Sequence, residues 1–143
     1  MLRFSSSRFG ELTVENDKAI YFSEGIIGFP WIKRYVILDH YREAPFKWLQ
    51  AVDDPDVAFV IVEPSIVKPD YTPAIDKENI ADIDIKDELD ICILLIVTIP
   101  HRDPTKVSIN LQAPIIVNVE NKRAKQIVLN DVDLSCYPLL QKS

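Results

Sequence analysis

Glycine is scarce in this chain of 143 residues, which contains only Gly10, Gly25 and Gly28. Loops that hold nucleotide phosphates need closely spaced glycines, because side chains would keep the backbone amides away from the phosphate. Three glycines in these positions do not build such a loop. The sequence therefore argues against the common nucleotide-binding motifs.

Histidine and cysteine are equally sparse, with His40, His101, Cys92 and Cys136 as the complete set. A metal site needs several ligands that converge on one point, and no close spacing of these residues indicates one. Cys92 lies inside an apolar run, where we expect a reduced core residue with a raised thiol pKa. We expect no metal, no cofactor, no catalytic residue and no small-molecule substrate. A Cys–His pair joined by the fold stays an open alternative.

Long apolar stretches are also missing. The longest run covers residues 91–97, far short of the roughly 20 residues that span a membrane as a helix. It predicts a buried strand. The first seven residues lack the apolar stretch of a signal peptide, so we expect a cytoplasmic protein with no membrane partner.

Basic residues are outnumbered, with 16 Lys and Arg against 22 Asp and Glu, which gives a formal charge of −6. The densest basic group, residues 122–125, is short. Nucleic-acid phosphates are bound by clustered Lys and Arg, so we expect no direct nucleic-acid binding. The acidic balance favours a basic partner, or serves solubility alone.

Short β-branched and apolar runs dominate the chain, and turn residues separate them. They predict strands at 10–14, 19–22, 34–38, 46–51, 57–62, 91–99, 106–110, 114–119 and 126–129. This pattern indicates an all-β fold, a small antiparallel β-barrel-like or sandwich single domain over residues 1–143. Residues 131–143 lack periodicity and are expected to form an irregular tail or a docked segment.

Helical signals are few. Asp76 is a suitable N-cap for a single turn at residues 77–80, and a second turn is expected at 31–34, with Trp31 or Ile32 packed inward. The prolines between residues 64 and 73 predict a surface loop or an irregular sheet edge. The fold should therefore contain one or two short helical turns.

The segment from Asp82 to Asp90 is strongly acidic. Aspartate and isoleucine alternate at 82–85, which predicts an edge strand with one acidic face. Such charges often prevent edge-to-edge aggregation. The alternative is a docking strip for a basic protein, formed by Asp82, Asp84 and Asp87.

Phe46, Trp48 and Gln50 occupy alternate positions of a predicted strand and should share one face, with Leu49 on the other. Phe46 and Trp48 either fill the core or form an exposed patch that anchors a partner. A buried Gln50 would need hydrogen-bond partners.

Asn110, Leu111 and Pro114 lie between two predicted strands. Pro114 should begin a strand or lie at an edge, and Asn110 can bind loop amides. The segment is either a structural corner or a partner contact.

Several short motifs follow one another along nearly the whole chain, and none of them is specific alone. They are Phe9-Gly10-Glu11-Leu12, Gly28-Phe29-Pro30, Pro45-Phe46-Lys47-Trp48-Leu49-Gln50, Asp54-Pro55, Thr98-Ile99-Pro100, Asn110-Leu111-Gln112-Ala113-Pro114 and Gln126-Ile127-Val128-Leu129. The ordered set resembles the flagellar assembly factor family, FliW. One departure lies near the end, where Tyr137 is followed by Pro138 and the family usually has an arginine close behind the tyrosine.

The resemblance implies a small antiparallel barrel-like protein that is not an enzyme. It implies flagellin and the RNA-binding regulator CsrA as partners. The factor would bind new flagellin and, when free, bind and antagonise CsrA, which relieves the repression of flagellin translation. The candidate contact residues are Phe46, Trp48, Gln50, Asp82, Asp84, Asp87, Asn110, Leu111 and Pro114.

Two other classes compete with this interpretation. A small β-barrel that binds RNA directly would need aromatic residues on a basic face, and the sequence pI of about 4.9 argues against it. An unrecognised Asp/His hydrolase would need carboxylates with perturbed pKa values in a cleft.

Overall fold

The computed structural model describes residues 1–39, 46–71, 73, 75–98, 107–129 and 137–138. His40, His101, Cys136 and nearly all of segment 131–143 lie outside these ranges, so the expectations for them stay predictions. The described strands are β1 (Leu2–Ser6), β2 (Gly10–Val14), β3 (Ile20–Phe22), β4 (Arg34–Leu38), β5 (Lys47–Ala51), β6 (Ala58–Val62), β7 (Ile91–Thr98), β8 (Ser108–Ile109), β9 (Ile115–Asn118), β10 (Arg123–Gln126) and β11 (Tyr137–Pro138).

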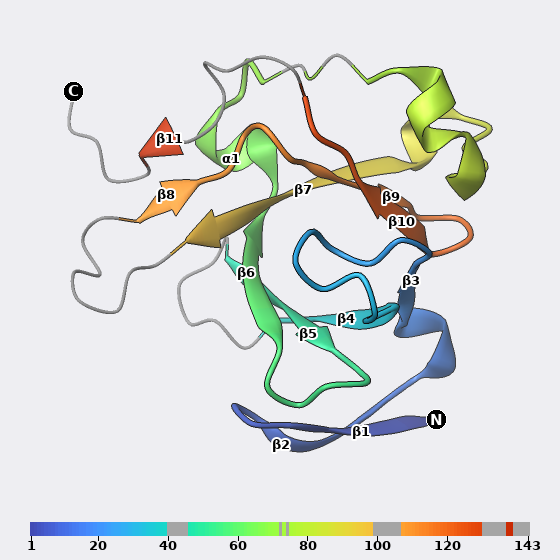
Figure 1. The fold of residues 1–143 in the computed structure, drawn as a ribbon, viewed down its shortest axis with the longest axis vertical. Coiled ribbons are helices and arrows are strands. Elements are labelled where there is room, and N and C mark those ends of the chain that lie inside the picture. The colour runs from blue at the N-terminus through green and yellow to red at the C-terminus, as the bar shows by residue number, and fades with distance from the viewer. Residues whose placement is uncertain (40–45, 72, 74, 99–106, 130–136, 139–143) are drawn as a thin grey trace.

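Seven of these strands close a barrel (Figure 1). Their order is β7-β6-β5-β4-β3-β10-β9, and β9 pairs back onto β7. The closing register joins Ile91 to Asn118 and Leu94 to Ile115. β8 pairs with the far end of β7, and β11 pairs with β8. The fold is all-β, as the sequence predicts.

Alternation along β7 explains its unbroken apolar sequence. Cys92, Leu94 and Ile96 belong to the cluster that fills the barrel, together with Phe22, Tyr35, Leu49 and Ile115. Ile91 and Ile93 join a second cluster, and Leu95 and Val97 a third. A strand covered by apolar residues on both faces has no polar positions to alternate.

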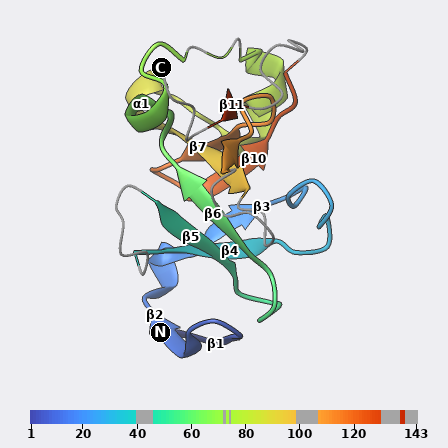
Figure 2. The same cartoon turned by 90° about the vertical axis from the view of Figure 1, so that its left-hand side faces the viewer.

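The β1–β2 hairpin forms a separate two-stranded sheet. Figure 2 shows it beneath the barrel, at the end opposite α1 (Pro64–Val67). Phe4 packs with Val36, Leu38 and Val52, so the hairpin covers the outer face of β4. The hairpin thus gives β4 a second buried face.

The strand predictions are largely confirmed. Strands 10–14 and 34–38 have the expected bounds, and the other predicted strands overlap observed ones. The strand expected at 126–129 is wrong in position, because β10 begins at Arg123 and ends at Gln126. The antiparallel expectation needs one correction, since β10 and β3 pair in parallel. The sequence analysis did not predict β1 or β11.

The helical predictions are confirmed in part. Asp76 caps η2 (Lys77–Ile83) by accepting a hydrogen bond from the Glu78 amide, but this 3-10 helix is longer than the expected turn. Residues 30–31 form a turn without a helix, with Ile32 buried and Trp31 exposed. α1 replaces part of the expected loop, with Pro64 in its first turn, where the missing amide hydrogen removes no helical bond. Two further 3-10 helices are η1 (Asn16–Lys18) and η3 (Glu88–Asp90).

No helix in the described part of the chain is both long and apolar enough to cross a membrane.

Tyr35 is the largest fully buried side chain, and its hydroxyl is the single buried side-chain polar atom without a partner among the described residues. Its ring packs edge-on against Phe22, with ring centroids 5.1 Å apart. Burial, assisted by the charge of Asp54, raises the pKa of Tyr35 to about 12. The barrel interior therefore holds a hydroxyl that forms no hydrogen bond with any described residue.

We expect Tyr35→Phe to raise the free energy of unfolding by about 1 kcal/mol, because it removes an unpaired buried hydroxyl. The gain should grow as pH rises above the ordinary tyrosine pKa of 10.0 towards about 12. In that interval Tyr35 ionises in the unfolded wild type but not in the folded one, so the wild type loses stability at this position and the variant does not. Urea unfolding at pH 7 and pH 11 measures both effects. Tyr21→Phe, at a position that is 47% exposed, is the control. A loss of stability in Tyr35→Phe would show that the hydroxyl has a partner.

Candidate functional site

The charge of this protein is concentrated in one short segment. Residues 76–90, called here the acidic segment, carry seven carboxylates and two lysines, a net charge of −5 out of −6 for the chain. All nine of these charged residues are exposed except Asp90, which is half-buried. Most of the acidic segment consists of η2 and η3, which lie above the barrel at one end of β7 (Figure 1).

The edge strand expected at residues 82–85 is wrong. Ile80 and Ile83 lie three residues apart, the period of a 3-10 helix, and both are buried against Ile116 and Ile127. The helix ends at Ile83, and the next residue, Asp84, has a left-handed backbone with φ 54°. The alternation of aspartate and isoleucine thus reflects a 3-10 helix and its left-handed end.

Two asparagines of the β9–β10 hairpin hold this helix end. The Asn118 amide donates to the Ile83 and Asp84 carbonyls at 2.9 and 3.2 Å, and the Asn121 amide donates to Ile83 at 3.0 Å. Asn118 is 2% exposed, so its bond to the Ile83 carbonyl lies out of water. These contacts offset the conformational cost of a non-glycine residue in the left-handed region.

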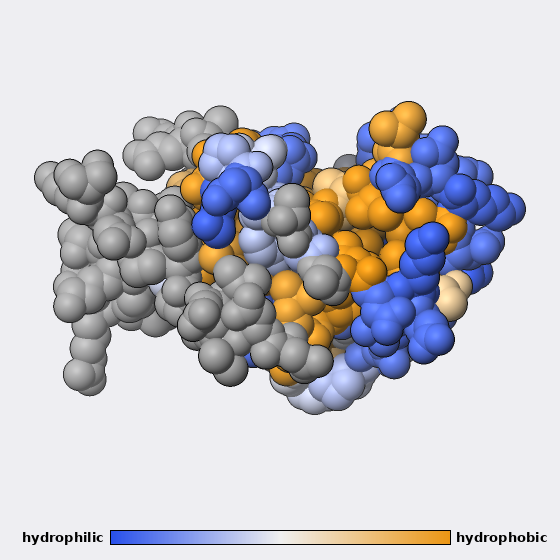
Figure 3. Space-filling model, turned by 90° about the horizontal axis from the view of Figure 1, so that it is seen from above, coloured by the Kyte–Doolittle hydropathy of each residue, from blue (hydrophilic) through white to orange (hydrophobic). Residues whose placement is uncertain are grey.

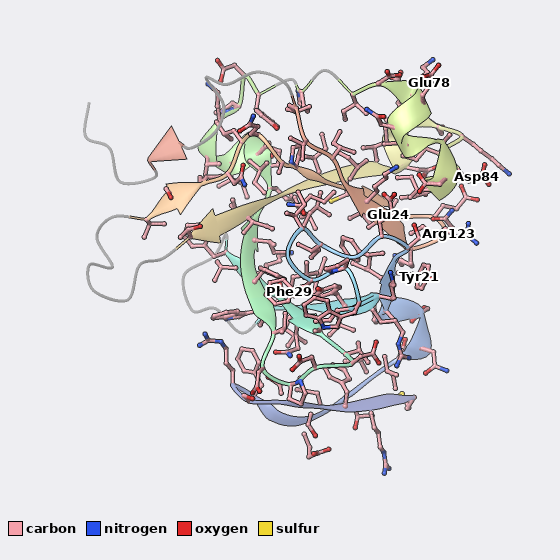
Figure 4. The ribbon with its side chains drawn as sticks, viewed as in Figure 1. Tyr21, Glu24, Phe29, Glu78, Asp84 and Arg123 are labelled. Carbon is pink, nitrogen blue, oxygen red and sulfur yellow. The ribbon has the colours of Figure 1, made fainter. Side chains whose placement is uncertain are left out.

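Lys125 of β10 ties the acidic segment to the loop after β3. Its ammonium lies 3.5 Å from Asp82 and 3.4 Å from Glu24. Figure 4 shows Glu24 and Asp84 on the same side of the molecule, above Arg123 and Tyr21. Partly exposed ion pairs contribute little free energy, at most about 1 kcal/mol each, so Lys125 mainly fixes position.

An apolar groove runs beside the acidic segment. Its volume is about 690 Å³, and its walls combine isoleucines from β7 and from the η2 region with charged residues at the rim. The isoleucine groove, as we call it, is lined by Ile75, Ile80, Ile85, Ile91 and Ile93, with Ala81, Lys77, Asp84, Lys86 and Glu88 around them. In Figure 3 a hydrophobic band lies between hydrophilic side chains on this upper face. The groove and the acidic segment together form the candidate site.

Asp82, Asp84 and Asp87 are all exposed in the acidic segment, and of the three Asp84 lines the groove. Asp84 lines the groove, Asp82 holds Lys125, and Asp87 caps η3 by accepting from the Leu89 amide at 3.0 Å. Sequence reasoning missed the groove isoleucines. The available signal was the three-residue spacing of Ile80 and Ile83, which continues the helical turn predicted at 77–80. The alternation at 82–85 predicts a strand instead, so the two isoleucines are assigned to different elements.

Phe46, Trp48 and Gln50 lie elsewhere, along β5. Phe46 and Trp48 are half-buried and pack against clusters outside the barrel, while Leu49 fills the interior. The Arg8 guanidinium carbon lies 4.4 Å from the centre of the Trp48 ring. These aromatic residues are therefore largely covered by the protein itself, and their contact with a partner stays a prediction.

Gln50 is fully buried, and its expected need for partners is confirmed. It accepts a hydrogen bond from the Ser6 hydroxyl at 2.8 Å and donates to the Ala51 and Val57 carbonyls at 3.1 and 3.2 Å. Gln50 thus joins the β1–β2 hairpin to the barrel.

Asn110, Leu111 and Pro114 form a corner before β9. The Asn110 carboxamide oxygen accepts from the Gln112 and Ala113 amides at 3.0 and 3.1 Å, as expected for an asparagine turn. Leu111 and Pro114 are buried, and Pro114 directly precedes β9. The Tyr71 hydroxyl donates to the Leu111 carbonyl at 2.7 Å, and burial raises the pKa of Tyr71 to about 12. The corner has a clear structural role, and partner contact there stays a prediction.

Cys92 faces the barrel interior as a free cysteine. Burial, assisted by Glu63, raises the pKa of its thiol. The prediction of a reduced core cysteine with a raised pKa is confirmed.

Comparison with known proteins identifies the family. A sequence model described as "FliW protein" matches residues 3–139. The chain belongs to the FliW family. It is 41% identical to the flagellar assembly factor FliW of Thermoanaerobacter pseudethanolicus over 143 residues, which cover 99% of this chain and 95% of the relative. It is 37% identical to that of Leptospira biflexa over 123 residues, 86% of this chain and 80% of the relative.

A solved structure agrees with the sequence match. The crystal structure of a flagellar assembly factor FliW superposes with a TM-score of 0.87 at 28% identity and covers 99% of both chains. The range matched by the FliW family model includes the acidic segment, the isoleucine groove, and Asn118 and Asn121, which hold the end of η2.

We expect Asn118→Ala to lower the free energy of unfolding by about 2–3 kcal/mol, because it removes the bonds to the Ile83 and Asp84 carbonyls and the acceptor of the Glu120 amide. Asn121→Ala removes a bond to the same Ile83 carbonyl from an exposed side chain and should cost less than about 1 kcal/mol. Urea unfolding compares the two variants. Equal losses would contradict the assignment of Asn118 as the main support of η2.

Proposed function

We propose that this protein is a non-enzymatic flagellar assembly factor that binds flagellin in the cytoplasm and, when free of flagellin, binds and antagonises CsrA. Antagonism of CsrA relieves its repression of flagellin translation. Membership of the FliW family carries this proposal, because the match covers nearly the whole chain. The relatives are named flagellar assembly factors, and we extend that role to this protein.

The acidic segment supports the choice of a basic partner. An RNA-binding protein must present Lys and Arg to phosphates. A segment with a net charge of −5 attracts such a surface and speeds its encounter with the protein. The same segment repels RNA, so the protein is suited to bind the regulator and not its transcript.

The design of a charge test follows from the structural roles of the carboxylates. Asp76 and Asp87 cap helices, Asp82 holds Lys125 and Asp84 has a left-handed backbone. Glu78 and Glu88 are exposed, and neither side chain accepts a hydrogen bond or forms an ion pair recorded among the described residues. They can be reversed with the least effect on the fold.

We expect purified CsrA and flagellin each to bind the protein saturably in titration calorimetry, and to compete with each other. The variant Glu78→Lys/Glu88→Lys should bind CsrA about tenfold more weakly, because it removes steering and attraction at the interface rim. Raising the salt concentration from 0.05 to 0.5 M should weaken the wild type more than the variant.

The matched control is Glu15→Lys/Asp17→Lys, which makes the same change in net charge at exposed positions near η1. It should bind CsrA like the wild type. Absence of binding to both partners would overturn the proposed function. If both double variants weaken CsrA binding equally, the loss of affinity depends on the net charge of the protein alone. That result would contradict the role of the acidic segment.

A further inference from the structure

We infer that the isoleucine groove is the seat for a segment of a protein partner that presents two or three aliphatic side chains flanked by lysine or arginine. This inference rests on the proposed function, because it assumes a basic protein partner. To the proposed function it adds the groove as a binding site and the kinds of side chain that the bound segment carries.

The groove is apolar where a partner would enter. Ile75, Ile85, Ile91 and Ile93 are only partly buried, although they pack against the core cluster under η2. A volume of about 690 Å³ lies within the range of pockets that enclose sizeable ligands. Leu89, next to the lining residue Glu88, is 89% exposed. An exposed apolar side chain beside an apolar groove is typical of an interaction surface.

The walls are held in place before any partner binds. Asp76 caps the start of η2, Asn118 and Asn121 hold its end, and Lys125 holds its side. Isoleucine is stiff at χ1, so the lining loses little freedom when it is covered. A preorganised surface avoids much of the ordering cost of association.

Charge selects the occupant. In the groove lining, Lys77 and Lys86 balance Asp84 and Glu88. The net charge of −5 comes from the five other carboxylates of the acidic segment. A second copy of this chain would bring the same net charge of −5 and be repelled, and so would RNA or an anionic lipid surface. A peptide segment with aliphatic and basic side chains complements both the apolar groove and the acidic segment around it.

The direct test uses three synthetic 12-residue peptides and isoleucine methyl NMR of the intact protein. One peptide combines leucine and lysine, the second replaces lysine by glutamate, and the third replaces leucine by serine. The leucine–lysine peptide should shift the methyl signals of Ile75, Ile85, Ile91 and Ile93 and leave those of Ile61 and Ile115, inside the barrel, unchanged. The other two should bind at least about tenfold more weakly, since each lacks one of the two required contacts. No shift at the groove, or equal binding of all three peptides, would overturn the inference.

A blocking variant links the groove to the natural partners. Ala81→Trp places a large side chain at an exposed position in the groove lining, and Thr13→Trp adds the same bulk on β2, away from it. Ala81→Trp should weaken both the leucine–lysine peptide and full-length CsrA at least about tenfold, and Thr13→Trp should weaken neither. If CsrA binds the wild type and Ala81→Trp equally, the groove inference fails while the proposed function stands. If neither CsrA nor flagellin binds the wild type, the proposed function fails, and the peptide result decides the groove alone.

Discussion

The pairing of β7 with β9 is the contact on which the other layers of the structure depend. It closes the barrel at residues 91–94, and the remainder of β7 pairs with β6 and β8. One strand therefore supplies side chains to three clusters, with Leu94 inside the barrel, Leu95 outside it near α1, and Ile93 under η2. A change in the register of β7 by one residue would exchange its interior and exterior side chains and disrupt all three clusters.

The candidate site is a consequence of this closure. Ile91 and Ile93 point outward at the place where β9 joins β7, and β9 ends with Asn118, which holds the end of η2. Two paired strands thus build the site: β7 supplies two lining isoleucines, and β9 supplies the asparagine that holds η2. The acidic segment is presented on a rigid support, which suits a surface that must bind without rearrangement.

The sequence predicted most strands because apolar alternation and turn residues are local signals, as at 10–14 and 34–38. It did not predict the parallel pairing of β10 with β3, which depends on the closure of the barrel as a whole. The short Asp–Ile alternation placed Asp82 and Asp84 on an edge strand, because a period of two residues is typical of strands. The contacts of Ile80 and Ile83 with β9 instead favour the 3-10 helix. The groove joins residues 75–85 to residues 91–93, and no local pattern in the chain reports that proximity.

The central claim is that partners bind the face formed by the acidic segment and the isoleucine groove. Hydrogen–deuterium exchange of the intact protein, alone and saturated with CsrA, tests it most directly. We predict slower exchange in peptides that cover residues 75–93 and little change at the Gln50 and Asn110 positions, whose structural contacts lie elsewhere. Slower exchange confined to residues 46–50 or 110–114, with none at 75–93, would contradict the account and move the binding surface to the β5 face or the corner before β9.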